Sequence, residues 1–233
     1  GVISIYMLIS YMAFSNARRS EQNKVWTGMA KETAHQIGTP LSALLGWIAY
    51  LKEQYPNEVA FGEMERDVDR LTAITERFSK IGSQPELTHT ELSDTIENSL
   101  DYLVNRMGKN VDFSSDIEKD LHAQHNPQLI SWVLENLITN ATDALEGKGQ
   151  IHVEAKRVGT DISIFVKDTG KGIPANIQRT IFQPGYSTKS RGWGLGLSLA
   201  KRIVKEYHNG TITLAESQLN QGSTFKIVLP SIL

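Results

Sequence analysis

The chain has 233 residues, of which 40% are hydrophobic, so it is long and apolar enough for one large domain or two small ones with a packed core. Its 24 basic and 26 acidic residues give a formal net charge of -2, and no overall positive field is present that would hold nucleic acid. The sequence contains no cysteine, which excludes disulfides, thiolate metal sites and cysteine nucleophiles. Nucleic acid is therefore not an expected partner.

The N-terminal residues 2–14, VISIYMLISYMAF, are almost entirely apolar, and Arg18, Arg19 and Lys24 follow them. A membrane-spanning helix needs about 20 apolar residues, so this stretch is too short to cross a bilayer. We interpret residues 1–19 as the end of a membrane-proximal or transmembrane helix with its basic residues on the cytoplasmic side. The alternative is a helix that buries its apolar stripe in a dimer.

Apolar residues then recur at alternating spacings of four and three, which is a heptad pattern. The first run is Ala30, Ala34, Ile37, Leu41, Leu44, Ile48 and Leu51. After Tyr55-Pro56-Asn57, the second run is Phe61, Met64, Val68, Leu71, Thr75 and Phe78. Two helices joined by a short turn bury one face each, so we expect residues 20–82 to form a helical hairpin that pairs with a second copy as a four-helix bundle. A homodimer is the predicted state.

His35 lies one position after the seam residue Ala34, which rotates its side chain about 100° away from the seam toward solvent. Pro40 has no N–H, so we expect the helix to bend next to His35. Thr39 follows His35 by four residues, on the same face, with a hydroxyl that can orient water or a phosphoryl oxygen. These features are compatible with a surface-exposed reactive histidine and weaken the alternative of a hydrogen-bonded core histidine.

After the linker signal Gly82-Ser83-Gln84-Pro85, the pattern changes to mixed helices and strands. The expected helices are residues 92–107, 127–145 and 195–208. The expected strands are residues 110–115, 121–124, 150–157, 161–167, 211–215 and 223–229. This order predicts an α/β sandwich over residues 83–233, with helices on one face of a mixed sheet. The predicted fold class is therefore α plus α/β.

Five motifs that contain glycine or asparagine follow one another in this second half: ENLITNATDA (135–144), DTGKGIP (168–174), IFQPGYSTK (181–189), GWGLGLS (192–198) and GSTF (222–225). Glycines permit positive φ and close approach of a ligand to the backbone. The free N–H groups of a helix beginning among glycines suit phosphate oxygens. The spacing fits neither a P-loop nor a dinucleotide-binding fingerprint. Each glycine cluster alone is also explained by a flexible turn.

Asn136 and Asn140 are four residues apart on one helix face, where their side-chain oxygens can help hold a magnesium ion that keeps water and phosphate as its other ligands. Two surface asparagines are the simpler alternative. Taken together in this order, the motifs resemble those of the sensor histidine kinases, from about Ser20 to the end of the chain. In that family a dimerisation and phosphoacceptor hairpin precedes an ATP-binding domain of the gyrase, Hsp90 and histidine-kinase superfamily.

The resemblance implies an ATP-dependent protein-histidine kinase in which His35 accepts the γ-phosphoryl group and passes it to an aspartate of a response regulator. It implies that Asn140, assisted by Asn136, holds the magnesium ion, and that Asp168 accepts a hydrogen bond from the adenine amino group. The other implied nucleotide contacts are Asp143, Gly170, Gly172, Ile173, Lys189, Arg191, Gly192, Gly194, Leu195, Gly196 and Thr224. The segment from Phe182 to Arg191 resembles the ATP lid, and the expected location is the cytoplasmic face of the bacterial inner membrane.

Two positions depart from the family pattern. Gln36 stands where many relatives have an acidic residue that accepts the imidazole proton, and Asp143 stands where many carry a lysine. Glu32, three residues before His35, is the nearest carboxylate that could replace the missing base; a solvated surface glutamate is the alternative. A catalytically weak scaffold, a phosphatase-dominant protein and a non-kinase ATPase of the same superfamily also remain open.

Overall fold

The computed structural model describes residues 6–7, 10, 36–55, 60–80, 85–105, 107, 110–189 and 194–231. The chain forms two compact units, Gly1–Pro85 and Glu86–Leu233. Among the described residues, no helix combines the length and apolar character needed to cross a bilayer. Most of residues 1–19, to which the membrane-helix interpretation applies, and most of the predicted 82–85 linker lie outside the described residues.

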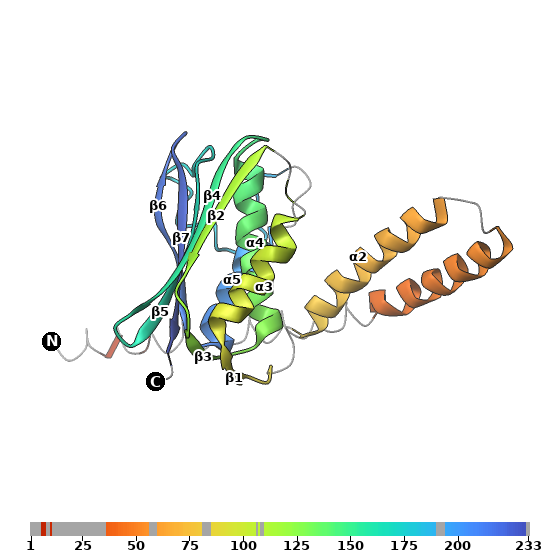
Figure 1. Ribbon diagram of the computed structural model, residues 1–233, viewed down its shortest axis with the longest axis horizontal. Coiled ribbons are helices and arrows are strands. Elements are labelled where there is room, and N and C mark those ends of the chain that lie inside the picture. Colours follow the sequence, from red (N-terminus) through yellow and green to blue (C-terminus); the bar gives the residue numbers. More distant parts are fainter. Residues whose placement is uncertain are drawn as a thin grey trace. The chain divides into compact units, whose positions relative to one another are not determined.

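The first unit contains the two helices of the predicted hairpin, residues 36–54 and α2 (Ala60–Lys80), which run side by side (Figure 1). Their shared core is made by Leu41, Ile48 and Val68, with Leu45 and Phe61 packed against it. Outside this core, Lys52 Nζ and Glu65 Oε2 form an ion pair of 2.7 Å between the helices. The heptad pattern thus locates both helices correctly, and the helix continues through Pro40.

Only part of each heptad seam is buried within one chain. Ile37, Leu44, Met64 and Leu71 remain 44%, 48%, 52% and 48% exposed, although all four belong to the predicted seams. Leu41 and Ile48, by contrast, are at most 6% exposed, because they face the other helix of the same hairpin. A second apolar surface is therefore left on the hairpin after it has folded.

The second unit is built on a five-stranded mixed sheet in the order β2-β4-β5-β7-β6. Its strands are β2 (Val111–Ile117), β4 (Gly149–Val158), β5 (Asp161–Asp168), β6 (Thr211–Gln218) and β7 (Gly222–Pro230). β2 pairs parallel with β4, and the other pairs are antiparallel. A bulge between Leu214 and Glu216 interrupts the β6–β7 register. The mixed sheet predicted from the sequence is confirmed.

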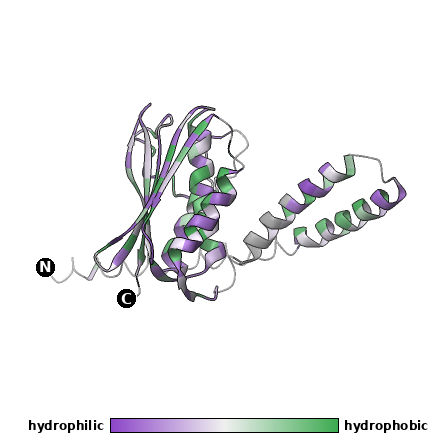
Figure 2. Ribbon diagram, in the orientation of Figure 1, coloured by the Kyte–Doolittle hydropathy of each residue, from purple (hydrophilic) through white to green (hydrophobic). Residues whose placement is uncertain are grey.

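Three helices cover one face of this sheet (Figure 1). They are α3 (Leu92–Val104), α4 (Pro127–Ala144) and α5 (Gly196–Arg202). Hydrophobic and hydrophilic residues alternate along strands such as β4, and the burial of their side chains alternates in the same way (Figure 2). The largest fully buried side chains include Ile96, Leu134, Ile138, Ile151, Ile164 and Ile203. This core holds α4 and the end of β5 in fixed positions.

The structure adds two features that the sequence patterns did not predict. A short strand, β1 (Thr88–Glu91), pairs antiparallel with β3 (His122–His125) as a separate two-stranded ribbon. The expected helix at residues 195–208 is α5 followed by a π-helical turn, η1 (Ile203–Tyr207). Gly210 N donates to the carbonyl of Val204 at 2.8 Å just after this turn, which draws the chain directly into β6.

Candidate functional site

Helix α4 forms the centre of the candidate site. It begins with Pro127 after Asn126, whose side chain accepts a hydrogen bond from Leu129 N at 3.1 Å and so caps the start of the helix. Its buried residues, among them Leu134 and Ile138, pack beneath it and fix its rotation. As a result, its polar residues at positions 136, 140 and 143 share the face that the other motifs approach.

Asn136 and Asn140 are both half-buried on this face. Asn136 Nδ2 donates to the carbonyl of Trp132 at 3.0 Å, which leaves the side-chain oxygen directed away from its own helix backbone. Gly196 begins α5 beside this oxygen, and a Cβ on Gly196 would lie 2.7 Å from Asn136 Oδ1. A glycine at position 196 therefore allows α5 to start against α4.

Asp168 ends strand β5 and is only 4% exposed. Its Oδ1 accepts a hydrogen bond from Gly170 N at 2.8 Å, and it lies opposite Ser223 in the sheet. Burial raises the pKa of the Asp168 carboxyl, an effect partly offset by backbone hydrogen bonds from Gly170 and Ser223. Thr224, the next residue on β7, is half-buried and pairs with Lys167. A buried carboxylate of this kind suits a ligand that offers an N–H donor.

The glycines after Asp168 are required by packing of the chain against itself. A Cβ on Gly170 would lie 2.6 Å from the carbonyl of Ala144 at the end of α4. Gly172 has φ +68°, and a Cβ there would lie 2.1 Å from the carbonyl oxygen of Gln218. The space expected for a ligand at these two positions is thus taken up, at least in part, by neighbouring backbone.

Sequence reasoning missed Ser217, which holds the loop after Asp168. Its Oγ accepts a hydrogen bond from Ile173 N at 2.8 Å and lies 3.0 Å from Ser223 Oγ. Gln178 Nε2 adds a bond to the carbonyl of Ile173 at 2.9 Å. A serine in a polar strand end gives no pattern in the sequence, so only the fold reveals that β6 supports this loop.

Phe182 anchors the beginning of the predicted lid. Its ring packs edge-on against Phe225 of β7 with the ring centroids 6.2 Å apart, and Lys201 Nζ of α5 lies 5.3 Å from its ring centroid. Further along, Gly185 N donates to the carbonyl of Gly194 at 3.0 Å, where Gly194 has φ +66°. These contacts join the IFQPGYSTK motif to the glycine motif that precedes α5.

Lys189, near the end of the described lid residues, reaches back to α4. Its Nζ donates to Asn140 Oδ1 at 2.9 Å and forms an ion pair with Asp143. Asn140 Oδ1 thus already faces a cation, which shows that this oxygen is accessible and correctly directed for one. The sequence predicted Lys189 as a phosphate contact and did not anticipate that Asp143 would bind it.

The structure therefore brings described residues of all five motifs together around α4 and the end of β5. His35, Glu32, Arg191 and Gly192 lie outside the described residues. Thr39 is exposed on the first helix of the hairpin, in the other unit, and Leu195 is half-buried directly before α5.

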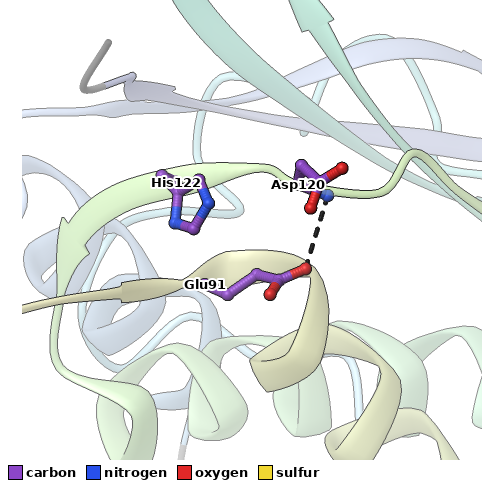
Figure 3. Close-up of side chains that lie close together, drawn as sticks. All are labelled: Glu91, Asp120 and His122. Atoms are coloured by element: carbon purple, nitrogen blue, oxygen red, sulfur yellow. Dashed lines mark hydrogen bonds between the residues drawn. The ribbon is translucent and has the colours of Figure 1, made fainter.

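A separate cluster of metal-ligating side chains lies on the β1–β3 ribbon (Figure 3). Ligand atoms of Glu91, Asp120 and His122 all lie within 4.8 Å of one another. Glu91 Oε1 accepts hydrogen bonds from Ser93 Oγ at 2.7 Å and from Asp120 N at 3.3 Å. These bonds tie the start of α3 to the turn before β3, so the arrangement is accounted for by a structural role.

Comparison with known proteins gives consistent results. Residues 125–232 match the family of histidine kinase-, DNA gyrase B-, and HSP90-like ATPases. The chain is 34% identical over 227 residues to sensor histidine kinase ZraS of Escherichia coli (strain K12), covering 91% of this chain and 47% of that protein. The chain thus spans about half the length of the curated relatives that it matches.

Solved structures show the same fold. The catalytic domain of histidine kinase ThkA has a TM-score of 0.57 and 29% identity, covering 63% of this chain and 96% of that one. Histidine kinase ThkA in complex with response regulator protein TrrA has a TM-score of 0.61 and 24% identity, covering 95% of this chain and 66% of that chain. The α/β sandwich with a preceding hairpin is therefore that of known kinases. Residues 125–232 therefore form an ATPase domain of the histidine kinase-, DNA gyrase B-, and HSP90-like family, and the chain is similar over most of its length to sensor histidine kinases.

Proposed function

We propose that the chain transfers the γ-phosphoryl group of ATP to His35 and then to an aspartate of a response regulator. The observation that carries this proposal is that two motifs contact α4: Lys189 of the lid donates to Asn140, and Gly170, two residues after the buried Asp168, packs against Ala144 at the end of the helix. In this arrangement the Asp168 carboxylate accepts a hydrogen bond from the adenine amino group. The phosphates then lie toward α4 and the lid, where cationic and N–H groups are available.

The residues of α4 fit a magnesium ion at the phosphates. Asn140 Oδ1 already faces the ammonium of Lys189 at 2.9 Å, and Asn136 presents a second amide oxygen one turn earlier. Magnesium is bound by few protein oxygens and keeps water and phosphate ligands, so two amide oxygens suffice. When bound, the ion neutralises charge on the transferred phosphoryl group. We assign its protein ligands as Asn140 and Asn136.

The phosphoryl step needs the imidazole of His35 in line with the γ-phosphate. An imidazole nitrogen attacks phosphorus, the bond to the β–γ bridging oxygen breaks, ADP leaves, and the other imidazole nitrogen gives up its proton. We assign Glu32 as acceptor of that proton, since residue 36 is an amide. We assign Thr39, four residues after His35 in the sequence, to orient a phosphoryl oxygen or a water molecule. Catalysis here is mainly positioning and charge neutralisation.

The partners follow from the hairpin. Ile37, Leu44, Met64 and Leu71 form an exposed apolar surface that a second hairpin would cover, which supports a homodimer built as a four-helix bundle. A receiver domain is the proposed second partner, as in the complex of ThkA with the response regulator TrrA.

We also propose that the N-terminal segment attaches the protein to the membrane, with this region on the cytoplasmic face of a bacterial inner membrane. The kinase names of the relatives favour this activity over a scaffold or a non-kinase ATPase.

The decisive test incubates the chain with ATP labelled in the γ-phosphate. We expect a protein-bound label that acid releases and base does not, which is the signature of phosphohistidine. His35→Ala should abolish the label while ADP binding survives, because the nucleotide site belongs to the other unit. His89→Ala, which removes an exposed histidine of that other unit, is the matched control and should keep the label. Retention of acid-labile label in His35→Ala would refute the assignment.

A further inference from the structure

Lys189 lies in a cation site formed by one face of α4. Its ammonium contacts Asn140 Oδ1 at 2.9 Å and also pairs with the carboxylate of Asp143, which follows Asn140 by three residues and so lies on the same helix face. An amide oxygen and a carboxylate oxygen together thus bind one positive charge. Asp143 supplies the only full negative charge among these three groups.

This arrangement conflicts with a metal ion on Asn140. Magnesium binds oxygen ligands at about 2.0–2.1 Å, so an ion on Asn140 Oδ1 would lie within a few ångströms of an ammonium that contacts the same oxygen. Two cations that contact the same oxygen repel each other. Lys189 and the metal therefore cannot use Asn140 Oδ1 together.

We propose that Asp143 is a positioning residue for Lys189: without nucleotide it holds the lysine of the lid on Asn140, and metal–nucleotide binding requires Lys189 to release that oxygen. Asp143 keeps the ammonium beside α4 after release, within reach of the phosphates. The metal part of this proposal rests on the proposed function, whereas the pairing of Lys189 with Asp143 does not. The lysine that many relatives carry at position 143 could not hold Lys189 in this way.

The strength of the pair suits such exchange. The Lys189 and Asp143 side chains are 43% and 49% exposed, so solvent screens their attraction. An exposed ion pair changes the ratio of the paired state to the released state by about 1.4- to 5-fold. The pair therefore favours the bound position of Lys189 but does not fix the lysine there. A divalent cation with its phosphates can therefore displace Lys189 from Asn140.

The pairing is tested by measuring how fast an amine-acetylating reagent modifies Lys189 in the nucleotide-free full chain, by mass spectrometry. We expect Asp143→Asn to speed modification of Lys189 about 2- to 5-fold at low salt, and high salt to raise the wild-type rate toward that of the variant. The matched control is Glu154→Gln, which removes the partner of Lys156 in an exposed pair of 2.6 Å on β4. It should speed modification of Lys156 and leave Lys189 unchanged. Equal Lys189 rates in wild type and Asp143→Asn would overturn the pairing.

The release step is tested by calorimetric titration with ADP in the presence of magnesium and in the presence of EDTA. The quantity compared is the ratio of the ADP affinity with magnesium to the ADP affinity with EDTA. If Lys189 competes with the metal for Asn140, this ratio should be about 2- to 5-fold larger in Lys189→Met than in the wild type. A lysine that serves only as a phosphate contact would weaken ADP binding in both conditions without that increase, and this result would overturn the release step. Absence of ADP binding by the wild-type chain would instead refute the proposed nucleotide site. The acetylation experiment on the Lys189–Asp143 pair would remain valid in that case.

Discussion

At the residue scale, the candidate site depends on where ionisable groups are buried. Asp168 was predicted as a site residue from its motif, but its 4% exposure and its bond from Gly170 N come from the sheet around it. Sequence also identified Asn140 and Lys189, yet it could not show that they touch, because 49 residues separate them in the chain. A motif thus identifies which residues carry the chemistry, and long-range packing decides what each one binds.

The first prediction concerns Asp168. Asp168→Asn should weaken ADP binding roughly 10- to 100-fold, because a hydrogen bond to a charged acceptor contributes about 1.5–3 kcal/mol. Since burial raises the pKa of Asp168 above the ordinary 3.8, wild-type affinity should fall as pH decreases toward that raised pKa. Calorimetry from pH 8 to pH 5 checks both effects. Equal pH dependence in wild type and Asp168→Asn would show that another group causes the loss.

The second prediction concerns the proton acceptor. A positioned general base contributes about 10²- to 10⁴-fold, so Glu32→Gln should slow autophosphorylation at least tenfold at saturating ATP. Adding Gln36→Glu to that variant should recover part of the rate, because it restores a carboxylate beside the imidazole. Glu53→Gln, which changes an exposed glutamate on the helix of residues 36–54, is the control and should leave the rate unchanged. A wild-type rate in Glu32→Gln would mean that water or the other unit takes the proton.

At the element scale, long periodic segments were predicted well and short polar ones were not. The strands β4 and β5 alternate clearly, and α4 has both a capping asparagine and a proline at its start. Strand β1 reads THTE, with three of its residues exposed, so no apolar period marks it. The π-helical turn Ile203–Tyr207 escaped prediction because its residues are as apolar and amphipathic as those of an α-helix.

Two buried histidines connect these irregular elements. His125 on β3 contacts Thr95 Oγ1 through Nε2 at 2.8 Å and the Ala123 carbonyl through Nδ1 at 3.0 Å. His208, after the π-helical turn, accepts from Asn126 N at 3.0 Å through Nε2, so its Nδ1 carries the proton toward the Ile203 carbonyl. Burial lowers the pKa of both histidines below 6.5. Both rings are therefore held in the neutral form.

The third prediction follows from these lowered pKa values. Because the unfolded chain protonates near pH 6.5 and the folded chain only at lower pH, the stability from neutral burial is complete above pH 6.5 and is lost as pH falls below it. The free energy of unfolding of the second unit, measured by urea denaturation, should thus decrease between pH 7.5 and pH 5.5. His208→Gln, which cannot titrate, should reduce this slope by up to about 1.4 kcal/mol per pH unit. His89→Gln should leave it unchanged, and an unaltered slope in His208→Gln would contradict the explanation.

At the scale of the whole molecule, the hairpin and the ATP-binding unit are stabilised to different degrees within one chain. The second unit closes its own core around the sheet, with residues such as Leu134, Ile164 and Ile203 at most 1% exposed. The hairpin buries Leu41, Ile48 and Val68 but leaves four of the described seam residues exposed. The heptad spacing predicted both helices, yet spacing alone did not tell which seam residues face the same chain.

That difference supplies the last prediction, which is that the hairpin determines the oligomeric state. Leu44 is 48% exposed in one chain, so a charge there costs the single hairpin little but would lie inside the proposed four-helix bundle, where burying an unpaired charge is expensive. Leu44→Glu should therefore convert a dimer into a monomer in sedimentation experiments, while ADP binding in the other unit is unchanged. Leu219→Glu places the same charge on a 56% exposed leucine of the second unit and should remain a dimer. A dimeric Leu44→Glu chain would show that subunits associate elsewhere, and a monomeric wild type would remove the four-helix bundle from the proposal.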